Sequence, residues 1–370
     1  MFLQQNKIML CFGTRPEAIK MAPLYHELKK NNFDIKLCVT AQHRKMLDQV
    51  LDFFEITPDF DLDLMKEKQS LNILSASILP EIDRVLAEED PDIVLVHGDT
   101  TTSSMVALAA FHRNIKVGHV EAGLRTYNKN SPFPEEINRQ ITSKIADYHF
   151  APTHQAKQNL RSEGIAESSI LVTGNTVIDA LLWTNNKLKN GYKSLKLADL
   201  NFLTNKKFIV VTGHRRESFG QSYIDFCEAL LEIAKDTTID IVFPVHLNPN
   251  VQKPVYEMLG QSPNIHLLEP VDYPTMVWLL DKCRLIISDS GGIQEEAPTF
   301  KKHILVTREV SERPEGVENG FSTLVGTNKQ MIIDKSRYYL ANPFTSTNDN
   351  PYGDGKASEK IANFLQNLSK

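Results

Sequence analysis

The chain of 370 residues is longer than the roughly 250 to 300 residues at which a single hydrophobic core stops growing, so two domains are expected. Its 41% hydrophobic and 24% charged residues exclude disordered and fibrous classes. A formal net charge of -5 lacks the positive excess of proteins that bind nucleic acid or anionic membranes, so any bound polyanion must be held by a few local cations.

Short apolar runs rich in valine and isoleucine alternate with longer segments of helical period, which is typical of parallel βαβ units. The first half predicts strands at Lys7–Phe12, Ile35–Val39, Asp92–His97, Lys116–Val120, Tyr148–Ala151 and Ile170–Thr173. A polar stretch, Asn185–Lys207, is interpreted as a connection between domains. The second half predicts strands at Phe208–Thr212, Asp240–Pro244, Ile265–Leu268, Leu285–Ser288, Ile304–Val306 and Ser322–Val325, followed by a surface helix at Ala357–Leu368. The pattern predicts an α/β fold of two doubly wound parallel-sheet domains that face each other across a cleft.

The loop after the first predicted strand carries two cations. Thr14–Glu17 has the spacing of a capping box, with Pro16 in the first turn of a helix. Arg15 and Lys20 lie near that helix start, where positive side chains oppose the helix dipole unless an anion lies between them. A bound phosphate would resolve this conflict. The alternative is that both are solvated surface cations.

Acidic residues follow the next strands, and ligands of open α/β sheets bind beyond the carboxyl ends of the strands. Asp99 comes after strand Asp92–His97 and Glu121 after strand Lys116–Val120, so both are expected in one crevice. Paired carboxylates there divide acid and base roles because their pKa values are pushed apart. Glu135 begins a further predicted helix. Asp99 could instead be an N-cap or Asx-turn residue, and Glu135 a favourable first-turn acid.

A glycine turn opens the corresponding site in the second half, where strand Leu285–Ser288 runs into Ser290-Gly291-Gly292 at a helix start. Glycines permit close backbone approach and the N–H groups of a helix start point at an anion, so this turn is predicted to cradle a phosphate. Glu296 is placed to accept hydrogen bonds from ribose hydroxyls. Arg313, after the next strand, offers a further phosphate partner.

The sequence lacks the motifs that are typical of nicotinamide binding, of P-loop phosphoryl transfer and of zinc hydrolysis. These three chemistries are therefore disfavoured. His214, in the loop after strand Phe208–Thr212, is a candidate to protonate a leaving oxygen. His246 is a weaker candidate, with a surface or core role as the alternative. The scattered cysteines are expected to be buried thiols, and the lack of a leader or spanning segment makes the cytoplasm the expected compartment.

Eight blocks together resemble the non-hydrolysing UDP-N-acetylglucosamine 2-epimerases of bacterial cell-surface polysaccharide synthesis, over nearly the whole chain. The blocks are Phe12–Pro23, His97–Thr101, His119–Arg125, Pro134–Arg139, Thr212–Glu217, Asp289–Pro298, Glu312–Glu315 and Asn350–Gly355. The resemblance implies a GT-B fold and a homodimer. An N-terminal Rossmann-like domain over residues 1–175 would carry the catalytic carboxylates, and a C-terminal Rossmann-like domain over 176–355 would bind UDP. The helix within 356–370 is expected to pack back on the first domain.

The resemblance also implies a reaction, the reversible inversion at C2 of UDP-N-acetylglucosamine to give UDP-N-acetylmannosamine. UDP would be eliminated to leave 2-acetamidoglucal and would then add back, which requires neither a redox cofactor nor a metal. Asp99, Glu121 and Glu135 look like the acid and base carboxylates, and His214 looks like the group that stabilises or protonates the leaving diphosphate. The residues that look like the family's contacts to UDP are Arg15, Lys20, Ser290, Gly291, Gly292, Glu296 and Arg313.

A second substrate molecule is expected to act as an allosteric activator, because many members of the family are activated in this way. The matching residues are Gln42, His43, Arg215 and His246. Lys45 and Lys68 stand where such members are expected to have glutamine and arginine, so the strength of activation stays open.

Three alternative functions stay open. A GT-B glycosyltransferase shares the Ser-Gly-Gly turn but has no need of three clustered carboxylates. A catalytically silent sugar-nucleotide sensor would have little reason to keep Asp99, Glu121 and His214 together. A hydrolysing epimerase would release free N-acetylmannosamine instead of returning UDP to C1.

Overall fold

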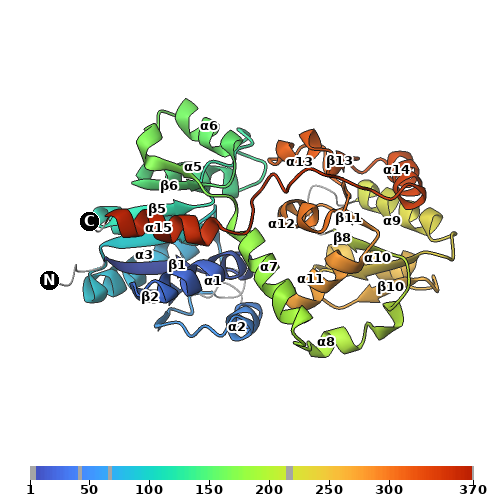
Figure 1. The fold of residues 1–370 in the computed structure, drawn as a ribbon, viewed down its shortest axis with the longest axis horizontal. Helices are drawn as coiled ribbons and strands as arrows, with labels where there is room; N and C mark the ends of the chain where they lie inside the picture. Colours follow the sequence, from blue (N-terminus) through green and yellow to red (C-terminus); the bar gives the residue numbers. More distant parts are fainter. Residues whose placement is uncertain (1–5, 41–43, 66–68, 214–219, 369–370) are drawn as a thin grey trace. The chain divides into compact units, whose positions relative to one another are not determined.

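A computed structural model of the chain describes residues 6–40, 44–65, 69–213 and 220–368. The chain divides into two compact units, which we call the N-terminal unit and the C-terminal unit (Figure 1). The N-terminal unit comprises Met1–Ala180 and Tyr352–Lys370, and the C-terminal unit comprises Leu181–Pro351. The chain therefore passes between the units twice, once inside helix α7 (Thr176–Lys189) and once directly before Tyr352.

The N-terminal unit is built on a seven-stranded parallel sheet with the order β3-β2-β1-β4-β5-β6-β7. Its strands are β1 (Lys7–Phe12), β2 (Asp34–Val39), β3 (Phe60–Asp61), β4 (Ile93–His97), β5 (Lys116–Val120), β6 (Tyr148–Ala151) and β7 (Ile170–Val172). All except β3 confirm predicted strands to within one residue at each end. β3 escaped prediction because its two residues are too few to show a pattern.

Helices flank this sheet and close its core. They are α1 (Arg15–Lys30), α2 (Arg44–Phe53), α3 (Leu71–Glu89), α4 (Thr101–His112), α5 (Glu135–Ile145), α6 (His154–Ser162), the short 3-10 helix η1 (Glu167–Ser169) and α15 (Ala357–Leu368). α3 and α4 pack together and, with β1 and β4, enclose fully buried side chains such as Met9, Ile78 and Val106.

The predicted C-terminal helix, α15, packs on the N-terminal unit. It lies against α1, as Figure 1 shows. The backbone N–H groups of Ala357 and Ser358 donate to the carboxylate of Asp179 over 3.2 and 2.8 Å. These two bonds satisfy N–H groups of the first helical turn, which have no partner inside a helix, and they attach the end of the chain to α7.

The C-terminal unit is built on a six-stranded parallel sheet with the order β10-β9-β8-β11-β12-β13. Its strands confirm the predictions to within one residue: β8 (Phe208–Thr212), β9 (Asp240–Pro244), β10 (Ile265–Leu268), β11 (Leu285–Ser288), β12 (Ile304–Val306) and β13 (Ser322–Leu324). Its helices are α8 (Leu195–Ala198), η2 (Asn201–Leu203), α9 (Gln221–Ile233), α10 (Pro249–Leu259), α11 (Tyr273–Lys282), α12 (Gly291–Glu296), η4 (Ala297–Phe300), α13 (Pro314–Glu318) and α14 (Lys329–Ala341). Within the described parts of the chain, no helix is both long enough and apolar enough to cross a bilayer.

The stretch interpreted as a connection between domains, Asn185–Lys207, instead forms part of the C-terminal unit. Leu200 and Leu203 are each 2% exposed and belong to its core. The hydroxyl of Ser194 donates to the carboxylate of Asp272 over 2.6 Å. The interpretation was wrong because isolated apolar residues set among polar ones, such as Leu200 and Leu203, show no periodicity even where they are buried.

Both sheets contain a point at which the strand order reverses. β1 lies between β2 and β4, and β8 lies between β9 and β11. Ligands of open α/β sheets bind at such a point, beyond the carboxyl ends of the strands. The loops after β1, β4 and β5, and those after β8, β11 and β12, are therefore where functional side chains are expected.

Candidate active site

Glu121, directly after β5, has a carboxylate with three nitrogen neighbours. Lys20 from α1 forms an ion pair with its Oε2 atom, and the side-chain amide of Asn175 donates to the same oxygen over 2.6 Å. His97 Nε2 lies 3.8 Å from that oxygen. The φ angle of Glu121 is 63°, a left-handed value that is uncommon for a residue with a Cβ atom. The fold therefore fixes both the backbone and one carboxylate oxygen of this predicted acid or base.

His97, the last residue of β4, is a neutral imidazole at physiological pH. Burial lowers its pKa to about 4, and although the charges of Glu121 and Asp99 oppose this shift, Lys20 adds to it. The side chain is only 4% exposed. A neutral imidazole beside Glu121 can take part in hydrogen bonds without adding positive charge to the crevice.

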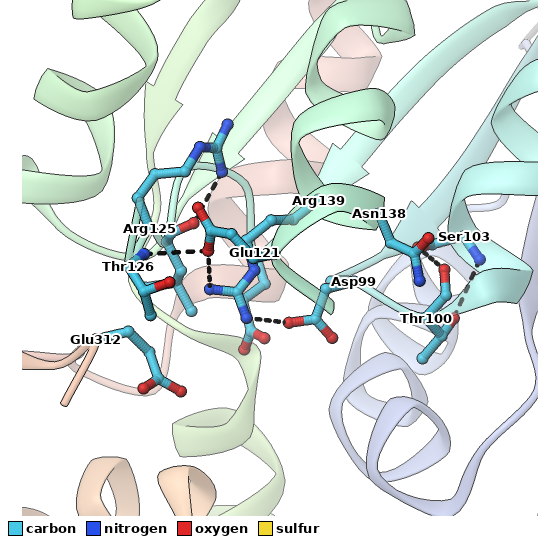
Figure 2. A network of polar contacts seen from close by, with 12 residues as sticks. Asp99, Thr100, Ser103, Glu121, Arg125, Thr126, Asn138, Arg139 and Glu312 are labelled. Carbon is cyan, nitrogen blue, oxygen red and sulfur yellow. Dashed lines mark hydrogen bonds and ion pairs between the residues drawn. The ribbon is translucent and has the colours of Figure 1, made fainter. Parts of the chain in front are cut away.

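Asp99, in the loop between β4 and α4, is held by Arg139 from α5. The Nη2 atom of Arg139 donates to Asp99 Oδ2 over 2.5 Å, and Figure 2 shows the guanidinium group beside the carboxylate. The arginine side chain is 5% exposed, whereas that of Asp99 is 26% exposed. A buried cation thus holds a carboxylate that still reaches solvent.

The acidic pair at the start of α5 divides into two roles. Glu136 is completely buried, and its oxygens accept from the backbone N–H groups of Thr126 over 3.0 Å and Tyr127 over 3.1 Å. Arg139 Nη1 donates to it over 3.4 Å, so Glu136 ties the preceding loop to the arginine that holds Asp99. Glu135, the predicted catalytic member, is half-buried as the first residue of α5. That place also suits the alternative of a first-turn acid.

The loop after β1 confirms the predicted capping box. Thr14 Oγ1 accepts the Glu17 N–H over 3.4 Å, and Glu17 Oε2 accepts the Thr14 N–H over 2.8 Å. Arg15 is half-buried as the first residue of α1. Lys20 is 8% exposed and paired with Glu121, which rules out the solvated-cation alternative for this lysine.

In the C-terminal unit, the turn after β11 is ordered by two hydroxyl groups. Ser288 Oγ, which is fully buried, lies 2.6 Å from Thr212 Oγ1 at the end of β8 and accepts the Ser290 N–H over 3.0 Å. α12 begins directly after Ser290, so Ser290-Gly291-Gly292 lies at the carboxyl edge beside the reversal of strand order. The sequence predicted a phosphate cradle at this place.

Arg313 lies directly over Gly291. A Cβ atom added to Gly291 would come within 2.5 Å of Arg313 Nη1, so only glycine leaves room for the guanidinium group. Arg313 donates to Glu295 over 2.7 Å and to Glu312 over 2.5 Å, and Glu312 also accepts from Arg308 over 2.8 Å. All four charged side chains are at most 7% exposed. Loss of one partner would leave a buried charge unpaired, so the network holds Arg313 in one orientation.

Two further predicted site residues are described. Glu296 is 5% exposed and accepts from the hydroxyl of Tyr273 over 2.9 Å. His246 is exposed, and its Nδ1 atom accepts the Asn248 N–H over 3.1 Å, a turn contact that suits the surface alternative.

Outside the described residues lie Gln42, His43, His214 and Arg215. Within residues 6–40, 44–65, 69–213 and 220–368, no group of three or more His, Cys, Asp or Glu side chains could hold a metal ion.

A profile of the family described as UDP-N-acetylglucosamine 2-epimerase matches residues 26–366. Relatives of that name from Campylobacter jejuni and from Escherichia coli strain K12 are 52% and 51% identical to this chain. The first alignment covers 97% of each chain and the second 98% of each. The chain belongs to the UDP-N-acetylglucosamine 2-epimerase family.

Solved structures of this epimerase family share the fold. The structure from Neisseria meningitidis, bound to UDP-GlcNAc, has a TM-score of 0.91 at 48% identity and covers 97% of this chain and 99% of its own. The Methanocaldococcus jannaschii structure, in complex with UDP-GlcNAc and UDP, has a TM-score of 0.86 at 36% identity, with coverage of 97% and 99%. A glycosyltransferase of kitacinnamycin shares the fold alone. Its structure has a TM-score of 0.60 at 10% identity and covers 99% of this chain and 95% of its own. The predicted family and the GT-B fold class are confirmed.

Sequence reasoning gave no role to Arg139, Asn175 or Glu295. Their side chains hold three of the predicted site residues in place. For Arg139 and Glu295 the sequence contains a signal, since both lie within about one helical turn of a predicted site residue, Glu135 and Glu296 respectively. Asn175 follows the last strand of the first sheet, in the kind of loop that borders a crevice.

Proposed function

We propose that this chain is a non-hydrolysing UDP-N-acetylglucosamine 2-epimerase that interconverts UDP-N-acetylglucosamine and UDP-N-acetylmannosamine. The observation that carries the proposal is the similarity over 97% of the chain to the Neisseria enzyme, which is bound to UDP-GlcNAc. The carboxylates and cations at the carboxyl edges of both sheets support it, because breaking a sugar–phosphate bond requires both kinds of charge.

The chemistry we propose is elimination followed by return of UDP. The C2 proton has no adjacent carbonyl group to acidify it, so its direct removal would be very slow. When a base takes that proton, the C2–H electron pair forms a C1–C2 double bond and the C1–O pair leaves with UDP. 2-Acetamidoglucal then receives a proton on the opposite face of C2, and UDP adds back to C1. The atoms and electrons balance without an oxidant or reductant.

The N-terminal unit is proposed to supply the proton-transfer groups. Asp99 and Glu121 each have one oxygen held by a cation, which leaves the rest of each carboxylate oriented by the fold. With Glu135, they are assigned as the acids and bases around C2. Their negative charge would also stabilise the positive charge that develops near C1 in the transition state.

The C-terminal unit is proposed to bind UDP. Ser290-Gly291-Gly292 and Arg313 are assigned to the diphosphate, and Glu296 to the ribose. Arg15 and Lys20 are assigned to the diphosphate as well. His214 would stabilise or protonate the departing UDP, since negative charge grows on its terminal oxygen as the C1–O bond breaks.

Incubation with UDP-N-acetylglucosamine in D2O, followed by NMR, tests the proposal. Elimination and return predict both UDP-sugars with deuterium at C2. Free N-acetylmannosamine accumulating in step with UDP would instead indicate a hydrolysing epimerase. An unchanged substrate that binds the protein would indicate a sensor, and turnover only with an added sugar acceptor would indicate a glycosyltransferase.

We also propose that the protein forms a homodimer. Apolar side chains are exposed on three helices that pack side by side, Ile73 on α3, Phe111 on α4, and Ile137 and Ile141 on α5, with exposed fractions from 39% to 60%. Exposed apolar side chains gathered on neighbouring helices would suit an interface between two copies of the chain. Light scattering should give twice the chain mass, and Phe111→Glu should reduce it.

Activation by a second substrate molecule, through Gln42, His43, Arg215 and His246, stays a prediction. It predicts sigmoidal dependence of the rate on UDP-N-acetylglucosamine concentration. His246→Ala should make this curve less sigmoidal at unchanged maximal rate. A hyperbolic curve for the unaltered protein would contradict activation by substrate.

A further inference from the structure

The carboxylate of Glu17 is buried between two loops of the candidate site and accepts hydrogen bonds from both. The residue is 2% exposed. Its Oε2 atom accepts the backbone N–H groups of Gly13 over 3.0 Å and Thr14 over 2.8 Å, and its Oε1 atom accepts the hydroxyl of Thr100 over 2.7 Å. Gly13 and Thr14 directly precede Arg15, and Thr100 directly follows Asp99.

Helix capping explains only part of this arrangement. In a capping box, the acidic side chain accepts from the N-cap residue, here Thr14, and such a glutamate can lie at the surface. The contacts to Gly13 and Thr100 go beyond that motif, and Thr100 lies 83 positions away in another loop. Burial outweighs all of these hydrogen bonds and raises the pKa of Glu17 to about 7. The fold therefore keeps a carboxylate in an unfavourable environment that a helix cap alone does not require.

Thr100 is oriented so that its hydroxyl points its proton at Glu17. Its Oγ1 atom accepts the Ser103 N–H over 3.1 Å as the N-cap of α4, so the hydroxyl hydrogen is available to donate to Glu17. The neighbouring Asp99 is held on its side chain by Arg139. Asp99 is thus supported twice, through its own carboxylate and through the backbone position that Thr100 fixes.

We propose that Glu17 is a positioning residue that fixes the Asp99 loop and the Arg15 loop relative to each other. A group that transfers a proton at C2 and a group that holds the departing diphosphate must keep their separation while the C1–O bond breaks and re-forms. Glu17, which is 2% exposed, provides that link through its contacts with Gly13, Thr14 and Thr100. The inference rests on the proposed function, because it takes Asp99 as an acid–base group and Arg15 as a phosphate contact.

Two pairs of variants test the link. Glu17→Gln keeps it, because the amide oxygen can accept from Gly13 and Thr14 while the amide nitrogen donates to Thr100, whereas Glu17→Ala breaks it on both sides. Thr100→Ser keeps the hydroxyl, whereas Thr100→Val removes it and leaves the Gly13 and Thr14 contacts intact. The conservative member of each pair serves as the control for its partner.

We expect Glu17→Ala to lower kcat by about tenfold or more and to weaken UDP binding, measured by calorimetry, by a similar factor, because both loops lose their support. Thr100→Val should lower kcat about tenfold while KM and UDP affinity stay within about threefold, because the Arg15 loop remains attached to Glu17. Glu17→Gln and Thr100→Ser, which keep the link, should retain most of the kcat of the unaltered protein. If Thr100 only stabilised the fold, Thr100→Val would not lower kcat while leaving KM and UDP affinity nearly unchanged.

Melting temperatures are measured in parallel, since Thr100→Val also removes a helix cap, and kinetics are recorded well below them. The inference is overturned if Glu17→Ala and Thr100→Val turn over at the unaltered rate, or if both lose kcat and UDP affinity in equal proportion. Asp99→Asn in the same series separates a failure of the proposed function from a failure of the link through Glu17. Full activity of that variant, or no epimerisation by the unaltered protein, would contradict the proposed function, and the UDP affinities of Glu17→Ala and Thr100→Val would then decide the link alone.

Discussion

Arg139 donates from its Nη2 atom to the Asp99 carboxylate over 2.5 Å, although the two residues lie 40 positions apart. The arginine comes from α5, the helix that begins with Glu135, and its other terminal nitrogen reaches the buried Glu136. One side chain thereby relates the end of β4, the start of α5 and the loop before it. Asp99 owes its orientation to this arginine.

Arg139→Lys should lower kcat by about tenfold or more, because an amine cannot donate to Asp99 and Glu136 in the fixed planar geometry of a guanidinium group. Steady-state kinetics with UDP-N-acetylglucosamine measure the loss. Arg113→Lys is the matched control, since Arg113 pairs with Asp83 in an exposed ion pair that contributes little. Equal kcat values for the two variants would show that Asp99 does not need Arg139.

Asn175→Asp should lower kcat by about 10²-fold, because it would place a second carboxylate 2.6 Å from Glu121 Oε2 in a buried setting. Asn175→Ser, which removes the donor without adding a charge, should cost less. Asn190→Asp adds the same charge at an exposed position and is expected to keep the unaltered rate. A similar loss in the serine and aspartate variants would mean that the missing hydrogen bond, and not repulsion, accounts for the effect.

Gly291→Ala should weaken UDP binding by about tenfold, because the added methyl group would displace the Arg313 guanidinium from its place over the turn. It should also lower the melting temperature, since Arg313 would move away from Glu295 and Glu312. Gly292→Ala is the control for stability, because a Cβ atom there meets no other atom within 4 Å. Equal melting temperatures for the two variants would argue against tight packing of Arg313 on Gly291.

Three buried histidines should make the protein less stable in mild acid. Burial lowers the pKa of His97 to about 4, of His119 to about 3 and of His303 to about 4, against an ordinary value of 6.5. At a pH between the lowered pKa of each folded histidine and 6.5, the unfolded chain binds more protons than the folded one. The free energy of unfolding therefore falls as pH drops from 6.5 toward 4. Glu17 acts in the opposite direction. Its pKa is raised from 4.5 to about 7, so its burial costs stability as pH rises through that interval.

Melting temperatures measured from about pH 7 down to 5 check this balance. His303→Phe should flatten the decline, because phenylalanine can keep the stacking on Tyr339 without taking up a proton. Glu17→Gln should steepen it, because the opposing titration is removed. Identical slopes in the unaltered protein and both variants would show that these groups do not control the acid response.

Local patterns in the sequence were enough to predict the strands and the capping box. Parallel strands buried on both faces appear as short, continuous apolar runs, and the Thr14–Glu17 box is contained within four residues. The bond from Asn175 to Glu121 joins residues 54 positions apart, and it follows from the order of strands in the sheet. Periodicity does not determine that order, so such supporting contacts could not be predicted.

The sequence also could not predict which of the adjacent residues Glu135 and Glu136 is completely buried. Two adjacent acids at a helix start are equivalent in sequence, and both are favourable there. Which one is buried depends on where the preceding loop places the N–H groups of Thr126 and Tyr127. That placement is a property of the folded loop.

Residues 352–370 are synthesised after the entire C-terminal unit, yet they belong to the N-terminal unit. The carbonyl oxygen of Tyr352 accepts the Asn175 N–H over 2.7 Å, and Asn175 in turn holds Glu121. On the ribosome, where the N-terminal part of a chain emerges and folds first, the carboxylate crevice therefore stays unfinished until translation has passed the second sheet. A polypeptide released before Tyr352 is added lacks both this contact to Asn175 and the helix that completes its N-terminal unit.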